Sequence, residues 1–526
     1  MNEAPSHPVF VSGPPGVGKS AVGRRAAELL KVPFFDTDHL IRHQLGASPA
    51  QILQTAGERV LRTAEAEALK GLDFSRPSVV ALGGGTLTRR ETHQGLRHHG
   101  LVLGLAAPPD QLWARIAADA EERPLAPSPS AFRTLLENRD GVYRSADAVL
   151  DATGQVDQVA AEVAKRSREL GIVRAQVGDT ISRVLVGVAL ETALEASLRL
   201  LSPSRPVLFI EDEAVPEPNR NAYFEAANRA APGAFRFGVP GGEGVKTWET
   251  LGSVLELALQ KGCGRQSVVV GLGGGATCDL AGCAAGLLGR GADLVLIPST
   301  LLAQADASVG GKCAVNTSAG KNLVGLFHPA RDVLADATLL HSLPEAELRS
   351  GWAEVFKMAV IRGGPLWEHL AATAHAGGIP SPEVIRLSIA GKAAIVQDDP
   401  FERGVRKTLN LGHTLGHALE RATGFGMRHG DAVAQGLAAM VRWSVHRGFL
   451  GADRGKAILD RQASLGLPIR MGPGALEAAL PHLRSDKKGS SRRGLVVGVR
   501  DVGDVDLIEV EWAQLGEELS RVENLQ

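Results

Sequence analysis

Cysteines and long apolar runs are both scarce in this chain. Its 526 residues include four cysteines, which form no CxxC pair and no disulfide-like framework. A reducing compartment suits this pattern, and we expect a cytoplasmic protein. No apolar run approaches the roughly 18 residues that a membrane helix needs. The start, "MNEAPSHPVFVSG", lacks the basic segment and long apolar stretch of a signal peptide. The sequence therefore predicts neither a membrane span nor a secretory leader.

Charge of one sign is also not in excess. Lys and Arg together number 57 and Asp and Glu 58, which gives a formal net charge of −1. Bulk electrostatics therefore gives no reason to expect nucleic acid or an anionic membrane as a partner. With 44% hydrophobic and 22% charged residues, the composition is typical of globular proteins. The length predicts about three structural domains.

Strand-like apolar runs alternate with helical stretches over residues 1–170, as in doubly wound α/β proteins. The expected strands are "HPVFVSG", "SVVALGGG" and "GLVLGLAA". The alternation begins again after a boundary near 166–177, with "PVLFIEDE", "QSVVVGLGGG" and "ADLVLIPST". From about 335 helical periodicity dominates, until a late strand pair, "GLVVGV" and "DVDLIEV". We therefore predict domains at 1–170, 171–334 and 335–526.

The segment "GPPGVGKS" fits the phosphate-binding pattern G-x-x-x-x-G-K-[ST] between a predicted strand and a predicted helix. Backbone N–H groups of such a loop bind phosphates. Lys19 would reach the β- and γ-phosphates, and Ser20 would hold Mg²⁺. The predicted ATP site consists of Gly13, Gly16, Gly18, Lys19 and Ser20.

The segments after this loop indicate the phosphoryl acceptor. In order they are "FFDTDHLIRHQLG", "GERVLRTAE", "LGGGT", "ERPLA" and "ENRDGVYRSAD", and this succession resembles shikimate kinase over residues 8–165. The resemblance implies Mg²⁺ near Asp36 and a lid arginine, Arg123, that meets ATP and the transferring phosphate. It implies a shikimate site at Asp38, Arg62, Gly84 and Arg139. Guanidinium groups suit the acceptor carboxylate, and the alternative for this half of the chain is a gluconate-type sugar kinase.

Two histidines lie four residues apart in "LNLGHTLGHALE". On a helix His413 and His417 would share one face, where packing, hydrogen bonding and metal binding all fit the spacing. A third histidine, His429, follows in "RHGDA", and "SGWAEVFKMAVI" supplies Glu354 and Lys357 one turn apart. Histidines and a carboxylate with one open position are how catalytic zinc is held. We therefore expect a candidate metal site in this part of the chain.

Four further segments complete a second pattern: "PGGEGVKT", "GLGGGATCDLAG", "IPSTLLAQADASVGGKCAVNTSAGKNLVGLFHP" and "GKAAIVQDDPFERGVRKTLNLGHT". Together they resemble 3-dehydroquinate synthase over roughly 175–526. The resemblance implies Zn²⁺ or Co²⁺ on Glu354, His413 and His429, with His417 near the substrate phosphate. The further substrate and catalytic residues that it implies are Asp306, Lys312, Asn322, Lys357, Lys392, Arg406 and Asn410. The implied NAD-site residues are Glu243, Lys246, Gly274, Gly275, Asp279, Ser299, Thr300, Lys312, Lys321 and Asn322.

The two resemblances together imply an α/β protein with a P-loop kinase domain, a Rossmann-like NAD-binding domain and a mainly helical metal-binding domain. The implied substrates are ATP, shikimate and 3-deoxy-D-arabino-heptulosonate 7-phosphate, which is converted to 3-dehydroquinate and phosphate. A homodimer through the synthase half is a further expectation. The alternatives are another sugar phosphate cyclase or a metal alcohol dehydrogenase in the C-terminal half, or one half that is an inactive binding module.

The junction between the halves is expected to be a tether. The segment "AKRSRELGIVRAQVGD" joins two parts that each have a glycine loop and a complete set of chemical groups. In the implied pathway the cyclised product must be dehydrated and reduced before the kinase uses it, so no intermediate passes directly between the sites. We therefore expect modest contact between the halves.

Overall fold

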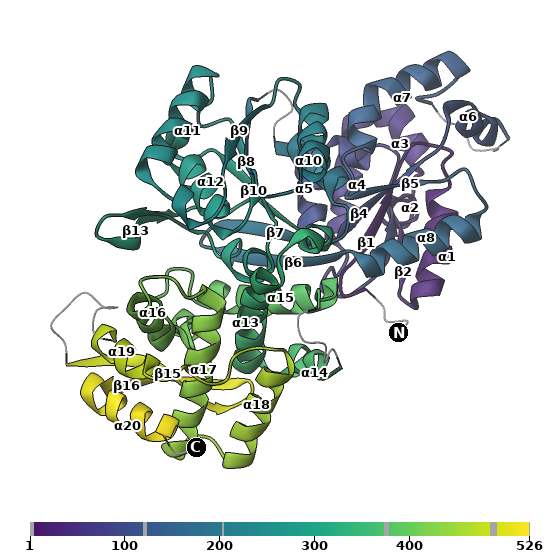
Figure 1. The fold of residues 1–526 in the computed structure, drawn as a ribbon. Coiled ribbons are helices and arrows are strands. Elements are labelled where there is room, and N and C mark those ends of the chain that lie inside the picture. The colour runs from purple at the N-terminus through teal and green to yellow at the C-terminus, as the bar shows by residue number, and fades with distance from the viewer. Residues whose placement is uncertain (1–4, 119–123, 202–204, 373–377, 484–491, 525–526) are drawn as a thin grey trace.

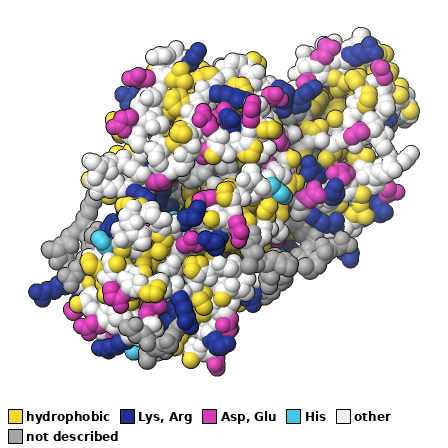
Figure 2. Space-filling view, viewed as in Figure 1, with side chains coloured by type: hydrophobic (Ala, Val, Ile, Leu, Met, Phe, Trp, Pro, Cys, Tyr) yellow, Lys and Arg dark blue, Asp and Glu magenta, His cyan; other side chains and the backbone are white. Residues whose placement is uncertain are grey.

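The computed structural model describes residues 5–118, 124–201, 205–372, 378–483 and 492–524 (Figure 1). Two α/β sheets lie side by side, and a mainly helical part follows the second sheet. Within these residues no helix is both long and apolar enough to cross a bilayer. Acidic and basic side chains are interspersed over the face drawn in Figure 2, in keeping with the net charge of −1.

The N-terminal part is a five-stranded parallel sheet in the order β2-β3-β1-β4-β5. Its strands are β1 (Val9–Ser12), β2 (Phe34–Asp36), β3 (Val79–Ala81), β4 (Leu101–Ala106) and β5 (Ala148–Asp151). Its helices are α1 (Lys19–Leu30), α2 (Thr37–Leu45), α3 (Pro49–Ala56), α4 (Glu58–Lys70), α5 (Arg90–His99), α6 (Pro109–Ala117), α7 (Pro129–Tyr143) and α8 (Val156–Glu169). Alternate strand residues face opposite sides, so Val9 and Val11 pack with α1 and α8, and Phe10 packs with α4 and α5.

The second sheet has seven strands in the order β6-β7-β14-β11-β10-β8-β9, and only the β6–β7 pair is antiparallel. The strands are β6 (Gly171–Val177), β7 (Thr180–Gly187), β8 (Val207–Asp212), β9 (Phe235–Val239), β10 (Val268–Gly273), β11 (Asp293–Pro298) and β14 (Asp332–Asp336). The helices are α9 (Glu191–Leu201), α10 (Glu217–Ala230), α11 (Trp248–Gln260) and α12 (Gly275–Leu287). Val207 and Phe209 pack toward α9 and α10, whereas Leu208 and Ile210 pack toward α11 and α12. A hairpin of β12 (Lys312–Thr317) and β13 (Gly320–Phe327) extends from this layer.

The C-terminal part is helical, as expected, with one late hairpin of β15 (Arg493–Asp501) and β16 (Asp504–Glu511). Its helices are α13 (Glu345–Arg362), α14 (Gly364–Ala372), α15 (Pro382–Asp398), α16 (His413–Ala422), α17 (His429–His446), α18 (Ala452–Ser464), α19 (Ala475–Ala479) and α20 (Trp512–Asn524). The central helix α17 packs against α13, α16, α18 and α20. This packing buries one face of the helices that carry the predicted metal ligands.

The expectation of a tether between the halves is wrong. Asp147 of the N-terminal part is fully buried, and it accepts hydrogen bonds from Arg97 Nη2 at 2.9 Å and from Arg183 Nη2 at 2.6 Å. Arg97 and Arg183 also lie 3.7 and 3.6 Å from Asp332, so these four residues form one buried ion network, the junction network. Around it a continuous hydrophobic cluster runs from α1 and α8 to α9 and α10.

The junction joins matching edges of the two sheets. Asp147 immediately precedes β5, and Asp332 is the first residue of β14 and pairs with Arg183 of β7. The N-terminal edges of the parallel strands therefore meet at the junction. The loops that follow the C-terminal ends of the strands, where α/β proteins bind ligands, open away from it.

Candidate active sites

The predicted phosphate loop joins β1 to α1. Gly13, Gly16 and Gly18 have φ values of 144°, 80° and 94°, a region that favours glycine. A Cβ at Gly16 would lie 2.7 Å from the carbonyl oxygen of Leu112, so a larger residue would not fit. Lys19 Nζ donates to the carbonyls of Gly13 at 3.0 Å and Pro14 at 3.1 Å, and Ser20 follows it in the first turn of α1.

The predicted acceptor carboxylates lie beside a second glycine loop. Asp36 caps α2, because its Oδ1 accepts from the N–H groups of Asp38 at 3.0 Å and His39 at 3.3 Å. Asp38 faces Gly83, where an added Cβ would lie 3.3 Å from its Oδ1. Gly84 contacts the ring of Pro15, with an added Cβ at 3.3 Å, so the acceptor loop adjoins the phosphate loop.

Arg62 and Arg139 converge on one carboxylate. Glu58 Oε1 accepts from Arg62 Nη2 at 2.7 Å and from Arg139 Nη2 at 2.5 Å. Burial raises the pKa of Glu58, but the hydrogen bond from Arg62 and the charge of Arg139 outweigh it and lower the pKa below its ordinary value. Tyr143 and Arg139 both donate to the Gly84 carbonyl, at 2.9 and 3.4 Å. The guanidinium pair is thus arranged around a carboxylate group.

Glu58 and Tyr143 were not predicted as site residues from the sequence. Glu58 lies four residues before Arg62 on α4, a spacing that allows an ion pair along one helix face, so this signal was present in the sequence. The predicted lid arginine, Arg123, lies outside the described residues.

The predicted NAD residues gather at the C-terminal ends of β10 and β11. Gly274 precedes the first residue of α12, and Ser299 and Thr300 directly follow β11. The two loops touch, since a Cβ at Gly274 would lie 3.4 Å from the Thr300 side chain, and Ser299 N donates to Gly273 O at 2.8 Å. A glycine loop that leads into a helix N-terminus at this edge suits a pyrophosphate.

Lys246 connects several of the other predicted NAD residues. Its buried Nζ lies 2.6 Å from Asp279 Oδ2, 2.5 Å from Asn322 Oδ1 and 3.6 Å from Glu243 Oε1. Burial raises the pKa of Asp279, and the nearby Lys246 offsets this only in part. Lys321 points elsewhere, with Nζ 4.3 Å from the centre of the Phe425 ring.

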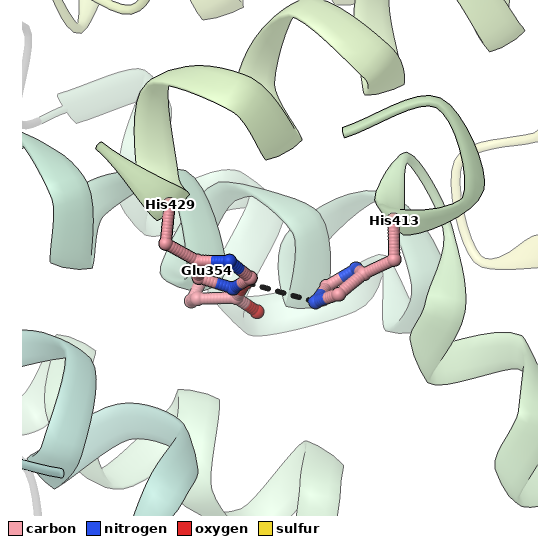
Figure 3. A group of neighbouring side chains, drawn as sticks. All are labelled: Glu354, His413 and His429. Carbon is pink, nitrogen blue, oxygen red and sulfur yellow. Dashed lines mark ion pairs between the residues drawn. The ribbon is translucent and has the colours of Figure 1, made fainter. Parts of the chain in front are cut away.

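Three helices bring the predicted metal ligands together (Figure 3). Glu354 is in the middle of α13, His413 begins α16 and His429 begins α17. The two His Nε2 atoms lie 3.4 and 3.5 Å from Glu354 Oε1, and one ligand atom from each residue lies within 4.8 Å of the others. His417 shares the helix face of His413, with ring centres 5.4 Å apart, and with Glu420 and His429 it forms a second group that could hold an ion.

The donor set of the first group fits a divalent metal. The Glu354 carboxylate is 1% exposed, and neither of its oxygens accepts a hydrogen bond among the described residues, although Lys357 forms an ion pair with it. Burial alone would raise the pKa of Glu354, but the charge of Lys357 and both histidines hold it well below its ordinary value. Burial and, to a lesser extent, the positive charge of Lys357 lower the pKa of His413 to about 3. This imidazole is therefore neutral and able to bind a metal. The Glu420 carboxylate lies 3.6 Å from His429 Nδ1 and orients that ring.

The remaining predicted substrate residues form two neighbouring groups. Lys392 Nζ lies 2.7 Å from Asp306 Oδ1. Asp306 belongs to a one-turn π-helix, Ala303–Ala307. Arg406 donates to the carbonyl of Gly310, which follows this helix by three residues, at 3.0 Å. The second group centres on Glu402, which lies 2.5 Å from Lys312 Nζ and accepts from Asn410 at 3.3 Å. Glu402 was not predicted from the sequence, and its φ of 58° is unusual for a residue with a side chain.

Comparison with known proteins covers both halves. The family model of shikimate kinase matches residues 15–168, and the N- and C-terminal models of 3-dehydroquinate synthase match 236–350 and 351–489. A bifunctional shikimate kinase/3-dehydroquinate synthase of Thermotoga maritima is 31% identical over 96% of this chain and 99% of its own. A 3-dehydroquinate synthase of Xanthomonas oryzae pv. oryzae is 40% identical over 59% of this chain and 87% of its own. A 2-deoxy-scyllo-inosose synthase, solved with carbaglucose-6-phosphate, NAD⁺ and Co²⁺, superposes with a TM-score of 0.60 at 25% identity and covers 66% of this chain and 99% of its own.

The fold and the two sites define a two-enzyme chain, a P-loop phosphotransferase followed by a lyase of the sugar phosphate cyclase type. The match to the Thermotoga protein extends over nearly the whole of both chains. This chain belongs to the bifunctional shikimate kinase/3-dehydroquinate synthase family, a fusion of two enzymes of the shikimate pathway.

Proposed function

We propose that one chain phosphorylates the 3-hydroxyl of shikimate with Mg²⁺-ATP and converts 3-deoxy-D-arabino-heptulosonate 7-phosphate to 3-dehydroquinate and phosphate. The observation that carries this proposal is the presence of two separate sets of groups. Arg62 and Arg139 lie around a carboxylate beside the phosphate loop. Glu354, His413 and His429 lie within 4.8 Å of one another in the helical part.

In the kinase half, the phosphate loop and the N-terminus of α1 would bind the ATP phosphates. Lys19 would exchange its bonds to the loop carbonyls for the β- and γ-phosphates, and Ser20 and Asp36 would hold Mg²⁺. Asp38 would orient the acceptor hydroxyl and receive its proton, and Arg123 would meet the transferring phosphate. Positioning and charge stabilisation account for this type of catalysis.

The shikimate carboxylate would bind between Arg62 and Arg139. Glu58 holds that position in the present structure, so binding requires the substrate carboxylate to displace the Glu58 side chain. Glu58 is partly exposed, at 42% of its side chain, and can turn toward solvent. Its charge keeps the two arginines from repelling each other until the substrate arrives.

In the synthase half, NAD would supply reversible oxidation of a secondary hydroxyl, and Zn²⁺ or Co²⁺ would supply Lewis-acid polarisation of that oxygen. The NAD pyrophosphate would lie on Gly274 and Gly275, with Ser299 and Thr300 beside it. Glu354, His413 and His429 are the residues proposed to hold the metal. The charge and buried position of Lys357 beside Glu354 suit a group that also contacts the substrate oxygen.

The cationic residues of the synthase half would bind the two anionic ends of the substrate. Lys392 and Arg406 approach the site from α15 and the segment before α16, and Lys312, Asn410 and His417 would receive the phosphate. In the elimination a base would take the proton of the acidified C–H, the electron pair of that bond would form a C=C bond, and phosphate would leave with the electron pair of its C–O bond. Asp306, held by Lys392, is positioned for proton exchange or for orientation of that lysine.

The proposed domain bounds are 1–170, 171–334 and 335–526, whereas the family models match 15–168, 236–350 and 351–489. We also propose a cytoplasmic enzyme that pairs through its synthase half, which size-exclusion chromatography with light scattering would test.

Reciprocal variants test the two activities. Lys19→Ala should abolish phosphoryl transfer to shikimate and leave phosphate release from the heptulosonate phosphate intact. Glu354→Gln should do the reverse, because it removes the charged ligand and does not touch the kinase half. Unchanged kinase turnover in the first variant, or unchanged cyclisation in the second, would refute the corresponding assignment.

A further inference from the structure

A cavity of about 240 Å³ lies at the junction between the two halves. It is enclosed by α5 on the kinase side and by α9 and the N-terminal ends of β11 and β14 on the synthase side. Five arginines line it: Arg90, Arg97, Arg183, Arg205 and Arg331.

Positive charge exceeds negative charge around this cavity. Asp293 and Asp332 are in its wall, and Asp147 pairs with two of the arginines behind it. Five guanidinium groups against three carboxylates leave an excess of two positive charges. His98 also lines the cavity and adds no charge near neutral pH, because burial lowers its pKa to about 4. The cavity therefore favours an anion.

Arg183 has a hydrogen-bond donor that the described residues do not use. Its side chain is 1% exposed, and Nη2 and Nε donate to Asp147 and to the Arg97 carbonyl. Among the described residues its Nη1 has no hydrogen-bond acceptor, and the nearest carboxylate oxygen in its ion pairs, Asp332 Oδ1, is 3.6 Å away. Its charge is thus only partly compensated by hydrogen bonds. Because Arg183 lines the cavity, an anion bound there would gain a favourable electrostatic interaction with this guanidinium group.

The rim of the cavity is open to a small molecule. Arg331 is 51% exposed and pairs with Asp293, and Arg90 is exposed and donates to the Leu201 carbonyl at 3.2 Å. The volume lies below the roughly 300–1,000 Å³ of typical drug-sized pockets. The occupant is therefore small, on the scale of inorganic phosphate, a short phosphorylated sugar or a tricarboxylate.

The cavity is separate from both proposed active sites, because it lies at the N-terminal edges of the two sheets and the sites lie at the C-terminal edges. An occupant would contact α5, which follows the Gly83–Gly85 loop, and the synthase strands at once. We propose that the cavity binds a small multiply charged anion, of the phosphate or polycarboxylate class, and that this anion strengthens the contact between the two halves.

The test uses the full chain and follows its thermal unfolding midpoint against increasing inorganic phosphate or citrate, with chloride added to keep the ionic strength constant. We also expect phosphate to bind at both active sites. The test therefore compares the anion response of a cavity variant with that of a control variant. The test variant is Arg90→Gln/Arg331→Gln, which changes two exposed side chains of the rim. The matched control is Arg76→Gln/Arg521→Gln, which removes the same charge from side chains that are 84% and 65% exposed elsewhere.

For at least one of the two anions, we expect the unfolding midpoints of wild type and control to rise over the same range of anion concentration. The test variant should need an anion concentration at least tenfold higher for the same rise. Loss of two charged hydrogen bonds is enough for that change. The anion with the larger variant-dependent response identifies the phosphate or the polycarboxylate class. Equal concentration dependence in all three proteins, for both anions, would overturn the proposal. If the double variant is unstable without anion, Arg331→Gln alone gives the same comparison.

Discussion

Asp147→Ala should destabilise both halves of the enzyme together. The Asp147 carboxylate accepts from Arg97, from Arg183 and from the Val102 N–H at 2.9 Å, and it is fully buried. Its removal leaves the two buried guanidinium groups with Asp332 as their one carboxylate partner among the described residues, at 3.7 and 3.6 Å. Breaking a buried ion pair by removing one partner costs about 3–5 kcal/mol. We expect the free energy of unfolding to fall by that amount.

The assay is urea unfolding near pH 7, followed by tryptophan fluorescence and by the two enzyme activities after each incubation. Asp140→Ala is the matched control, since that carboxylate pairs with Arg144 one turn away and both side chains are more than half exposed. Its loss should cost less than about 1 kcal/mol. Asp147→Asn keeps the shape and serves if the alanine variant does not accumulate. A midpoint shift no larger than that of the control, or kinase loss without synthase loss, would refute this reasoning.

Three further predictions concern single sites. Arg139→Ala should raise the KM for shikimate at least tenfold, because a charged hydrogen bond to the carboxylate is lost, and leave phosphate release by the synthase half unchanged; an unchanged KM contradicts the assignment. His429→Ala should lower the bound zinc per chain in elemental analysis, and full zinc content in that variant rules out the ligand role. Burial lowers the pKa of His7 to about 4 and that of His93 to about 3, from 6.5. Between pH 6.5 and 4 the unfolded chain thus binds more protons than the folded one, and stability should fall with decreasing pH by roughly 1.4 kcal/mol per unit for each histidine. His93→Phe should flatten this slope in urea titrations, and a slope equal to that of wild type would show that His93 is not buried in its neutral form.

The local patterns in the sequence were sufficient to predict much of the fold. A phosphate loop between strand and helix is a contiguous signal, and the structure has it between β1 and α1. The long apolar runs at β4, β8, β10 and β11 are strands, and the late hairpin is present at β15 and β16. Among the strands that were not singled out, β2 and β5 have three and four residues at sheet edges, and the eight-residue β7 is interrupted by the charge of Arg183, so all three give weak periodicity.

The junction could not be predicted, because its charges are indistinguishable from solvated ones in sequence. Arg97, Asp147 and Arg183 come from three distant segments, and only the packing of two sheet edges brings them together. The metal site was easier to predict from the sequence, because His413 and Glu354 belong to recognisable motifs. Glu58 and Glu402 hold predicted substrate-binding cations in the present structure. The spacing of Glu58 and Arg62 on one helix was a signal for the first pair, whereas no motif indicated that Glu402 would pair with Lys312.

The most direct test of two independent chemistries in one chain is a pair of assays on one purified preparation treated with a zinc chelator in excess Mg²⁺. One assay follows ATP-dependent phosphorylation of shikimate, and the other follows phosphate release from 3-deoxy-D-arabino-heptulosonate 7-phosphate in the presence of NAD. We predict that chelation abolishes phosphate release and leaves phosphorylation unchanged, and that Zn²⁺ or Co²⁺ restores the lost activity. Absence of either activity before chelation, or phosphate release that persists in metal-free protein, would contradict this account.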